Sequence, residues 1–278
     1  MRQTVPGFPH IGLLAAVLGV ASFAEIPAAD DDKGVMRDLV RRYAKDKNPS
    51  ELTLATGMNV QHVLALEHSI LLVKDGKAEP LLNPEKHQFR VGDRVRIRIR
   101  AVTDAYLYIF NEGASGERVC LLPDQREKAP LVKAGEVVDL PTDGGSFEFV
   151  APPGKELLRV VATSKPTEDL TGLLNAVFKK EHLTPKEEDL KKSIRAKVEG
   201  RLQSIGKQQD QTVAYRGLLS KEAMKGVRAK VQQAGSDEVV LRDLPSAKQP
   251  STFTMVAGAK PDAQPLMLTI SLQSVPEK

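Results

Sequence analysis

The sequence predicts a mainly β protein with an α insertion (α+β): an antiparallel β-sandwich core, a short N-terminal helix and a helical segment before the closing strands. Three observations predict this class. Apolar and polar residues alternate with a period of two through most of residues 51–164, which is typical of half-buried strands. Turn signals rich in Gly, Pro and Asp separate the alternating runs about every 8–12 residues, as in sandwiches and barrels. The period becomes helical before and after this stretch.

These changes of period divide the 278 residues into five segments. We expect a signal peptide at 1–24, a charged segment with a short helix at 25–50, the β-sandwich core at 51–164, a basic helical insertion at 165–235, and closing strands with a tail at 236–278. The net charge of +4 is too small to favour a dedicated nucleic-acid binder, so no nucleic-acid partner is expected.

The N-terminus has the features of a secretory signal peptide. Arg2 provides a positive charge, residues 11–21 form an uncharged apolar run, and Ser22 and Ala24 make a small-x-small cleavage pattern. We therefore expect signal cleavage after Ala24 and an exported chain, periplasmic or secreted, with no transmembrane anchor after cleavage. The run is shorter than the roughly 20 residues of a membrane-spanning helix; an uncleaved anchor is the alternative. The lone Cys120 lies far from the cleavage point, which excludes a lipid anchor there.

Short β-type runs account for the core and for the end of the chain. In the core they are expected at 69–74, 89–102, 105–110, 118–122, 136–140, 146–150 and 156–163. The closing strands are expected at 238–241, 252–256 and 266–272. Cys120 falls within one of these runs, between apolar neighbours, so we interpret it as a small core residue rather than a nucleophile.

Helical spacing marks the segments on either side of the core. Apolar residues in 34–46 recur at helical intervals and predict an amphipathic helix. In the insertion, helices are expected from 167 to about 181, from Thr184 onward and over 221–232. The second of these has one apolar stripe, made by Leu190, Ile194, Val198, Leu202 and Ile205. We expect the stripe to pack against the sheet; docking of a partner is the alternative, and so is a separate domain for the whole insertion.

The core carries several short motifs in a specific order. They are Phe89-x-x-Gly92-Asp93-Arg94-Val95, Ala105-Tyr106-Leu107-Tyr108-Ile109-Phe110, Leu122-Pro123, Ala134-Gly135, Leu140-Pro141 and Pro153-Gly154-x-Glu156. This order resembles a bacterial, β-rich family of unknown function, the DUF4384-type domain, over about residues 68 to 164. The resemblance implies an extracytoplasmic accessory or interaction module, and it implies no activity.

A row of arginines follows one face of the expected strand 89–102. Arg94, Arg96, Arg98 and Arg100 alternate with apolar residues, so their side chains lie about 7 Å apart on one face. Such a row suits an anionic wall polymer or lipid head groups, because each guanidinium can donate two hydrogen bonds to a phosphate. The alternative is a solvated face on which Glu136, Asp139 and Glu148 of neighbouring strands pair with the arginines.

No other pattern indicates a reaction. The histidines His62, His68 and His87 lack the spacing of metal ligands, and we expect no metal, no cofactor and no catalytic residue. The sequence contains neither a G-x-S-x-G elbow nor a P-loop. We therefore expect a non-enzymatic envelope interaction or scaffolding module whose partner is an unknown envelope protein or an anionic polymer. Polyanion binding through the arginine row and an unrecognised envelope hydrolase are the alternatives.

Overall fold

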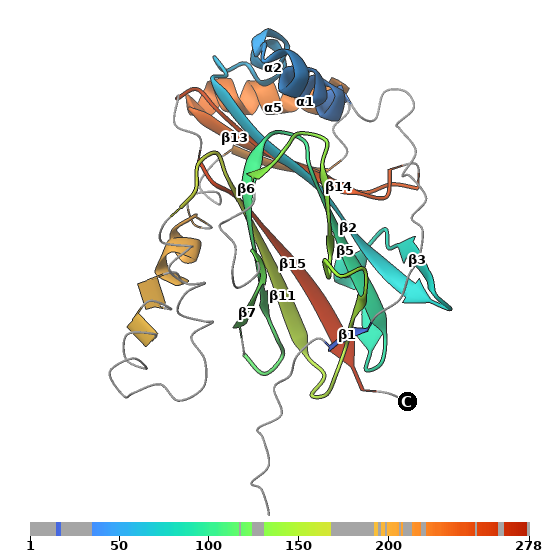
Figure 1. Cartoon of the computed structure of the whole chain (residues 1–278). Helices are drawn as coiled ribbons and strands as arrows, with labels where there is room; N and C mark the ends of the chain where they lie inside the picture. The colour runs from blue at the N-terminus through green and yellow to red at the C-terminus, as the bar shows by residue number, and fades with distance from the viewer. Residues whose placement is uncertain are drawn as a thin grey trace, which may run out of the picture.

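A computed structural model of the chain shows two β-sheets packed face to face, with helices on the outer face of one sheet (Figure 1). The structure describes residues 15–17, 35–116, 118–123, 131–167, parts of 192–207, 213–217, 221–247, 249–260 and 264–276. The arrangement is mainly β and α+β, with a β-sandwich at its centre, as the sequence predicts. The expected cleavage residue Ala24 and the helix expected at 167–181 lie outside the described residues, apart from the first position of that helix.

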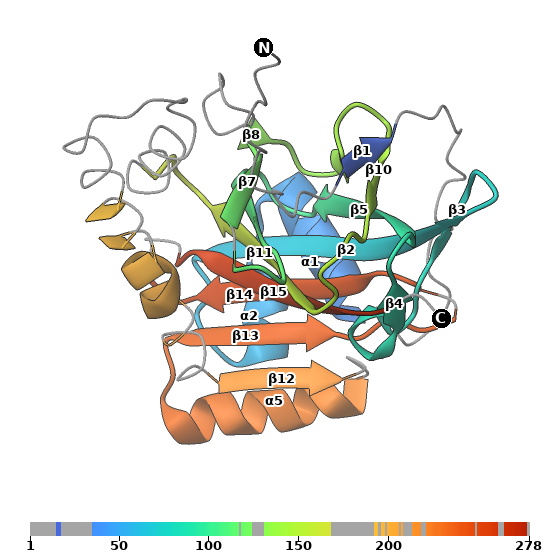
Figure 2. The same ribbon diagram turned by 90° about the horizontal axis from the view of Figure 1, so that it is seen from below.

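The larger sheet, sheet A, contains the arginine row. Its strand order is β1 (Ala15–Val17), β10 (Ser146–Glu148), β5 (Arg94–Ala101), β2 (His62–Lys74), β14 (Thr252–Gly258), β13 (Glu238–Asp243) and β12 (Val213–Gly217). Two further strands extend it: β3 (Lys77–Pro80) pairs with β2, and β9 (Val137–Leu140) pairs with β5. Figure 2 shows this order from β1 at one edge to β12 at the other.

The smaller sheet, sheet B, lies against the inner face of sheet A. Its order is β4 (Gln88–Arg90), β15 (Leu266–Val275), β11 (Lys155–Thr163), β6 (Ala105–Glu112) and β7 (Arg118–Leu122), with β8 (Leu131–Val132) paired to β6. A 3₁₀ turn, η1 (Pro84–Lys86), precedes β4.

Two strand pairs depart from the expected antiparallel pattern. β12 runs parallel to β13, and β15 runs parallel to β4. The first pair arises because the helix α5 (Lys221–Ala234) carries the chain from the end of β12 back to the start of β13. The segment 165–235, expected to be helical, therefore also contributes a strand to sheet A.

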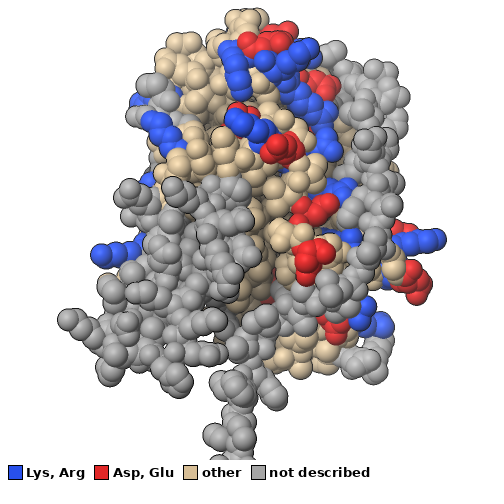
Figure 3. Space-filling view, in the orientation of Figure 1, with Lys and Arg blue, Asp and Glu red and all other residues tan. Residues whose placement is uncertain are grey.

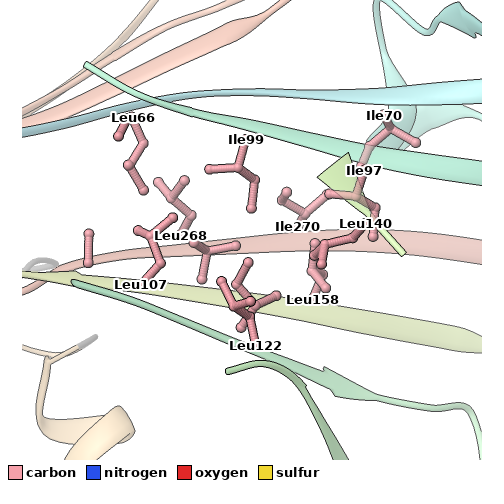
Figure 4. Close-up of a cluster of buried hydrophobic side chains, with 14 of the residues drawn as sticks. Leu66, Ile70, Ile97, Ile99, Leu107, Leu122, Leu140, Leu158, Leu268 and Ile270 are labelled. Atoms are coloured by element: carbon pink, nitrogen blue, oxygen red, sulfur yellow. The ribbon is translucent and has the colours of Figure 1, made fainter. Parts of the chain in front are cut away.

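The core between the sheets is built from the alternating residues of both. On β5, Val95, Ile97 and Ile99 point inward and are at most 3% exposed, whereas the arginines between them point outward. Figure 4 shows leucines and isoleucines of the two sheets meeting in this layer. The hydrophobic period of two thus fixes which face of β5 is available to solvent or to other segments.

A helical layer covers part of the outer face of sheet A. It comprises α1 (Val35–Asp46), α2 (Ser50–Thr56) and α5, which pack on β2, β13 and β14 (Figure 1). Met36 and Val40 of α1 and Val227 of α5 are buried in one apolar cluster with Phe253 and Met255 of β14. No helix in the described ranges is both long and apolar enough to span a membrane.

Leu202 and Ile205, the described members of the predicted apolar stripe, pack on the outer face of sheet B. Leu190, Ile194 and Val198 lie outside the described residues. Residues 199–205 are helical, and Leu202 and Ile205 are buried in a cluster with Tyr108, Phe110 and Val161. Arg159 of β11 also lies 3.4 Å from Glu199 in an ion pair. This part of the insertion is therefore integrated with the sandwich by apolar and ionic contacts.

Candidate functional site on the outer face of sheet A

The four arginines predicted as an anion site do share one face of β5. Their surroundings differ along the strand, because β10 borders one part of β5 and β9 another, while β2 runs along the opposite side. The register places Glu148 opposite Arg94 and Asp139 opposite Arg98. Cross-strand positions of this kind bring side chains within about 5 Å, so opposite charges can pair.

Three of the arginines are bonded within the fold. Arg94 Nε lies 3.1 Å from Glu148 Oε2. Arg98 donates two hydrogen bonds, of 2.7 and 2.9 Å, to the two carboxylate oxygens of Asp139. Arg96 is buried and donates to the carbonyl oxygen of Gly144 at 2.6 Å. Asp139 and Glu148 thus pair with arginines across strands, as the alternative interpretation of the row predicted. Glu136 does not take part in this pairing: its carboxylate accepts a hydrogen bond from the backbone N–H of Lys133.

Arg100 differs from the other members of the row. It is half-buried, and its side chain forms no hydrogen bond or ion pair with any residue in the described ranges. Glu67 lies directly opposite it on β2, but that carboxylate is bonded to Arg41 of α1 at 2.7 Å and lies 3.7 Å from Arg37. Arg100 is therefore the one guanidinium of the row for which the structure shows no internal partner among the described residues.

A buried ionic network next to this row was not predicted from the sequence. Arg37 of α1 donates from Nε to Asp243 Oδ2 at 2.9 Å, and its other nitrogens donate to the hydroxyl and the carbonyl oxygen of Ser251. The Arg37 and Asp243 side chains are 2% and 1% exposed. Arg37 also lies 5.6 Å from the ring centroid of Phe253. One sequence signal points to it: Arg37 lies between Met36 and Leu39 on the apolar stripe of α1, where an ordinary helix would carry an apolar residue.

The charges of the outer surface are mixed in sign. In Figure 3 the blue Lys and Arg side chains lie among red Asp and Glu side chains over the described part of the face shown. Surface pairs such as Arg42–Glu51, at 2.8 Å, contribute to this pattern. A mixed surface gives weaker attraction to a polyanion than a continuous basic stripe.

The histidines and the cysteine occupy separate structural positions. His62 and His68 are buried on β2, and His87 packs edge-on against Phe89 with ring centroids 4.6 Å apart.

Cys120 is buried, and its Sγ donates to the carbonyl oxygen of Leu122 at 3.2 Å. In the described ranges no three His, Cys, Asp or Glu side chains come together as a possible metal site.

Burial of His68 strongly changes the pKa of its imidazole. Its neighbours Leu66 and Ile70 belong to the core between the sheets, so the alternation of β2 places the His68 ring on that inner face. Desolvation lowers the pKa of His68 to about 3, with further lowering by the positive charges of Arg242 and Arg37. The imidazole is therefore neutral at physiological pH.

This combination of a two-sheet sandwich, a helical cover and internally bonded charges defines an α+β protein built on a β-sandwich. Residues 88–166 match the model of a family described as a domain of unknown function (DUF4384), so the chain contains a DUF4384-type domain. The match covers less than a third of the chain and extends from β4 through β11. No match to the chain was found among curated proteins or among solved structures.

The matched segment does not form complete sheets by itself. In sheet B, β15 lies between β4 and β11, and in sheet A, β2 lies between β5 and β14. Both β2 and β15 lie outside the matched residues. The DUF4384-type domain is thus one part of a larger folded unit to which residues on both sides contribute strands.

Proposed function

We propose that the chain is an exported, non-enzymatic interaction or scaffolding module of the cell envelope. The observation that carries this proposal is that ion pairs of sheet A and its helical layer hold separate segments in place. Arg37 joins α1 to β13, Arg94 joins β5 to β10, and Arg98 joins β5 to β9. Ion pairs of this kind fix the positions of the segments they join and so support a surface of fixed shape.

Export is supported by the sequence and is compatible with the folded core. Cleavage after Ala24 would leave α1 intact, because α1 begins at Val35 and its first fully buried residue is Met36. Of the described residues, only those of β1 would be removed. We therefore infer that the mature chain keeps both sheets and the helical cover.

The proposal is tested by co-sedimentation of residues 25–278 with a native envelope fraction, at low and at high salt. Sedimentation that is saturable, survives high salt and is lost after protease treatment of the envelope is the expected result, because it identifies a protein partner. Apolar contacts are insensitive to salt, whereas exposed ionic contacts are screened. A chain that stays in the supernatant under both salt conditions would contradict the proposal.

Polyanion binding is the second candidate, and the absence of an internal partner for Arg100 favours it. If this site operates, polyphosphate should bind the mature chain with an affinity that falls as salt rises. The variant Arg100→Ser should then reduce both the affinity and its salt dependence. Arg42→Ser is the matched control, because Arg42 is an exposed arginine paired with Glu51 on the helical layer. Equal binding by wild type and Arg100→Ser would exclude this candidate.

A further inference from the structure

The outer edge of β10 is covered by residues that the sequence predicts to be removed. β1 runs antiparallel to β10, with Ala15 opposite Glu148 and Val17 opposite Ser146. β1 lies within the uncharged apolar run 11–21, ahead of the expected cleavage after Ala24. Removal of this run leaves β10 as the terminal strand at this end of sheet A.

We propose that the outer edge of β10 is a strand-binding site that accepts an extended, uncharged apolar segment of a partner protein in antiparallel register. The inference rests on the proposed function, because it requires export and cleavage of the chain. It specifies where on the fold the partner of the proposed function binds, namely at the β10 edge, and which part of the partner binds there, namely an extended apolar segment. Addition of a strand to a sheet edge is a general mode of peptide recognition.

Several contacts that do not involve β1 hold β10 in position. On its inner side, the backbone N–H of Phe149, which follows β10, donates to the carbonyl oxygen of Asp93 at 2.9 Å. The ion pair between Arg94 and Glu148 ties the strand to β5, and the Phe147 side chain belongs to the core between the sheets. The edge is therefore formed before a ligand arrives, which lowers the entropic cost of binding.

The alternation of the backbone identifies the groups that a ligand would contact. Phe149 bonds on the β5 side, so the backbone groups of Ser146 and Glu148 point to the opposite side, toward β1. Removal of β1 leaves these N–H and C=O groups without a strand partner among the described residues. An incoming residue opposite Phe147 shares the inner face with that buried ring, so an apolar residue fits there.

The composition of this edge differs from that of a protected edge on the same sheet. β3 carries Lys77, Glu79 and Pro80, residue types that discourage the addition of another strand. β10 reads Ser146-Phe147-Glu148 and contains neither Lys nor Pro. Its one charged side chain, Glu148, is paired with Arg94. The outer edge of β10 is thus open to a further strand once β1 has been removed.

The test uses a fluorescent peptide of residues 11–21, with added C-terminal lysines for solubility, and the mature chain of residues 25–278. Fluorescence anisotropy measures binding of the parent peptide and of two singly N-methylated peptides. Methylation at Val17 removes an N–H that faces β10, and methylation at Ala16 removes one that faces away. We expect binding by the parent, a loss of about tenfold or more for the Val17 peptide, and a change within about threefold for the Ala16 peptide.

The other results separate this site from the proposed function. No binding by the parent peptide, or equal losses for the two methylated peptides, would overturn the site, even if the mature chain still sediments with the envelope. Binding with the expected pattern but without co-sedimentation would retain the site and overturn the proposed function. A dimer of the mature chain that the peptide dissociates would show that a second copy is the occupant and would overturn the assignment to a partner.

Discussion

The Nε atom of Arg37 lies 2.9 Å from Oδ2 of Asp243, although 206 residues separate the two along the chain. This contact joins the first described helix to a strand that follows the helical insertion. An early and a late segment of the chain are thereby linked in the helical layer, and both lie outside the residues that match the DUF4384 model. The stability of the whole unit should therefore depend on this pair.

We predict that Arg37→Met lowers the free energy of unfolding by about 3–5 kcal/mol, because it leaves the Asp243 carboxylate buried without its partner. The matched control is Arg42→Met on the same helix, whose pair with Glu51 is more than half exposed on both sides. That substitution should cost no more than about 1 kcal/mol. Urea unfolding followed by circular dichroism measures the free energy of unfolding of both variants. Equal losses would show that the buried pair does not stabilise the fold more than an exposed pair does.

Because His68 is neutral in the fold, we predict that the free energy of unfolding decreases as the pH is lowered. Its pKa is about 3 in the fold against an ordinary value of 6.5, so the unfolded chain binds the proton first as the pH falls. The contribution of the neutral His68 to the free energy of unfolding is present above pH 6.5 and is lost progressively as the pH decreases from 6.5 toward 3. Within this window the expected slope from one proton is roughly 1 kcal/mol per pH unit.

The variant His68→Gln isolates this contribution, because glutamine does not titrate. Urea unfolding of both proteins should give a constant difference in stability between pH 7 and 8. Between pH 6.5 and 5 the wild type should lose stability more steeply than the variant. Parallel pH profiles over that range would be incompatible with a buried neutral His68.

The close approach of His62 to Gly258 predicts a strong intolerance of a side chain on β14. A Cβ atom at Gly258 would lie against the ring atom Cε1 of His62 and only 2.8 Å from Nε2. The ring is held by contact of Nδ1 with the carbonyl oxygen of Lys260 at 2.6 Å, so its displacement breaks another interaction. Gly258→Ala should therefore destabilise the fold by about 1–3 kcal/mol.

Gly226→Ala is the control for that substitution. Gly226 is exposed in the middle of α5, and a Cβ atom there meets nothing within 4 Å. Alanine should stabilise the helix by up to about 1 kcal/mol. Thermal melting should thus move in opposite directions for the two variants, and a shift in the same direction would contradict the packing around His62.

The docking of the insertion on sheet B predicts a cost for truncating its apolar stripe. Leu202 is 4% exposed, so Leu202→Ala should lower the free energy of unfolding by about 2–5 kcal/mol. Leu54→Ala on α2 is the control, because Leu54 is 68% exposed. Chemical denaturation monitored by circular dichroism should separate the two variants, whereas a negligible effect of Leu202→Ala would mean that the insertion is independent of the sandwich.

Most of the strands in residues 105–163 could be located from short β-type runs bounded by turn signals in the sequence. β7 has the expected bounds, and β6 extends two residues beyond the expected 105–110. The single run expected at 89–102 is instead divided between β4 in sheet B and β5 in sheet A. β2 is longer than the expected 69–74, since it begins at His62. Its first eleven residues are buried on both faces, by sheet B and by the helical layer, so no alternation marks them.

The features that depend on distant contacts could not be predicted in this way. β12 was missed because its five residues lie between helical segments and acquire their strand partner only through β13. Likewise, the pairing of Arg98 with Asp139 could be proposed as an alternative, but the choice required the register of β5 with β9. Arg37 and Asp243 have no local relationship, and only the packing of α1 on sheet A brings them together.

Export and processing of the chain before it acts can be tested by the intact mass of the chain recovered from the producing cell. We expect the chain to be found in the envelope or the medium, with a mass that corresponds to residues 25–278. This result would also establish that β1 is absent from the mature protein, as the strand-binding proposal requires. A chain that stays in the cytoplasm and retains residues 1–24 would contradict both export and the opening of the β10 edge.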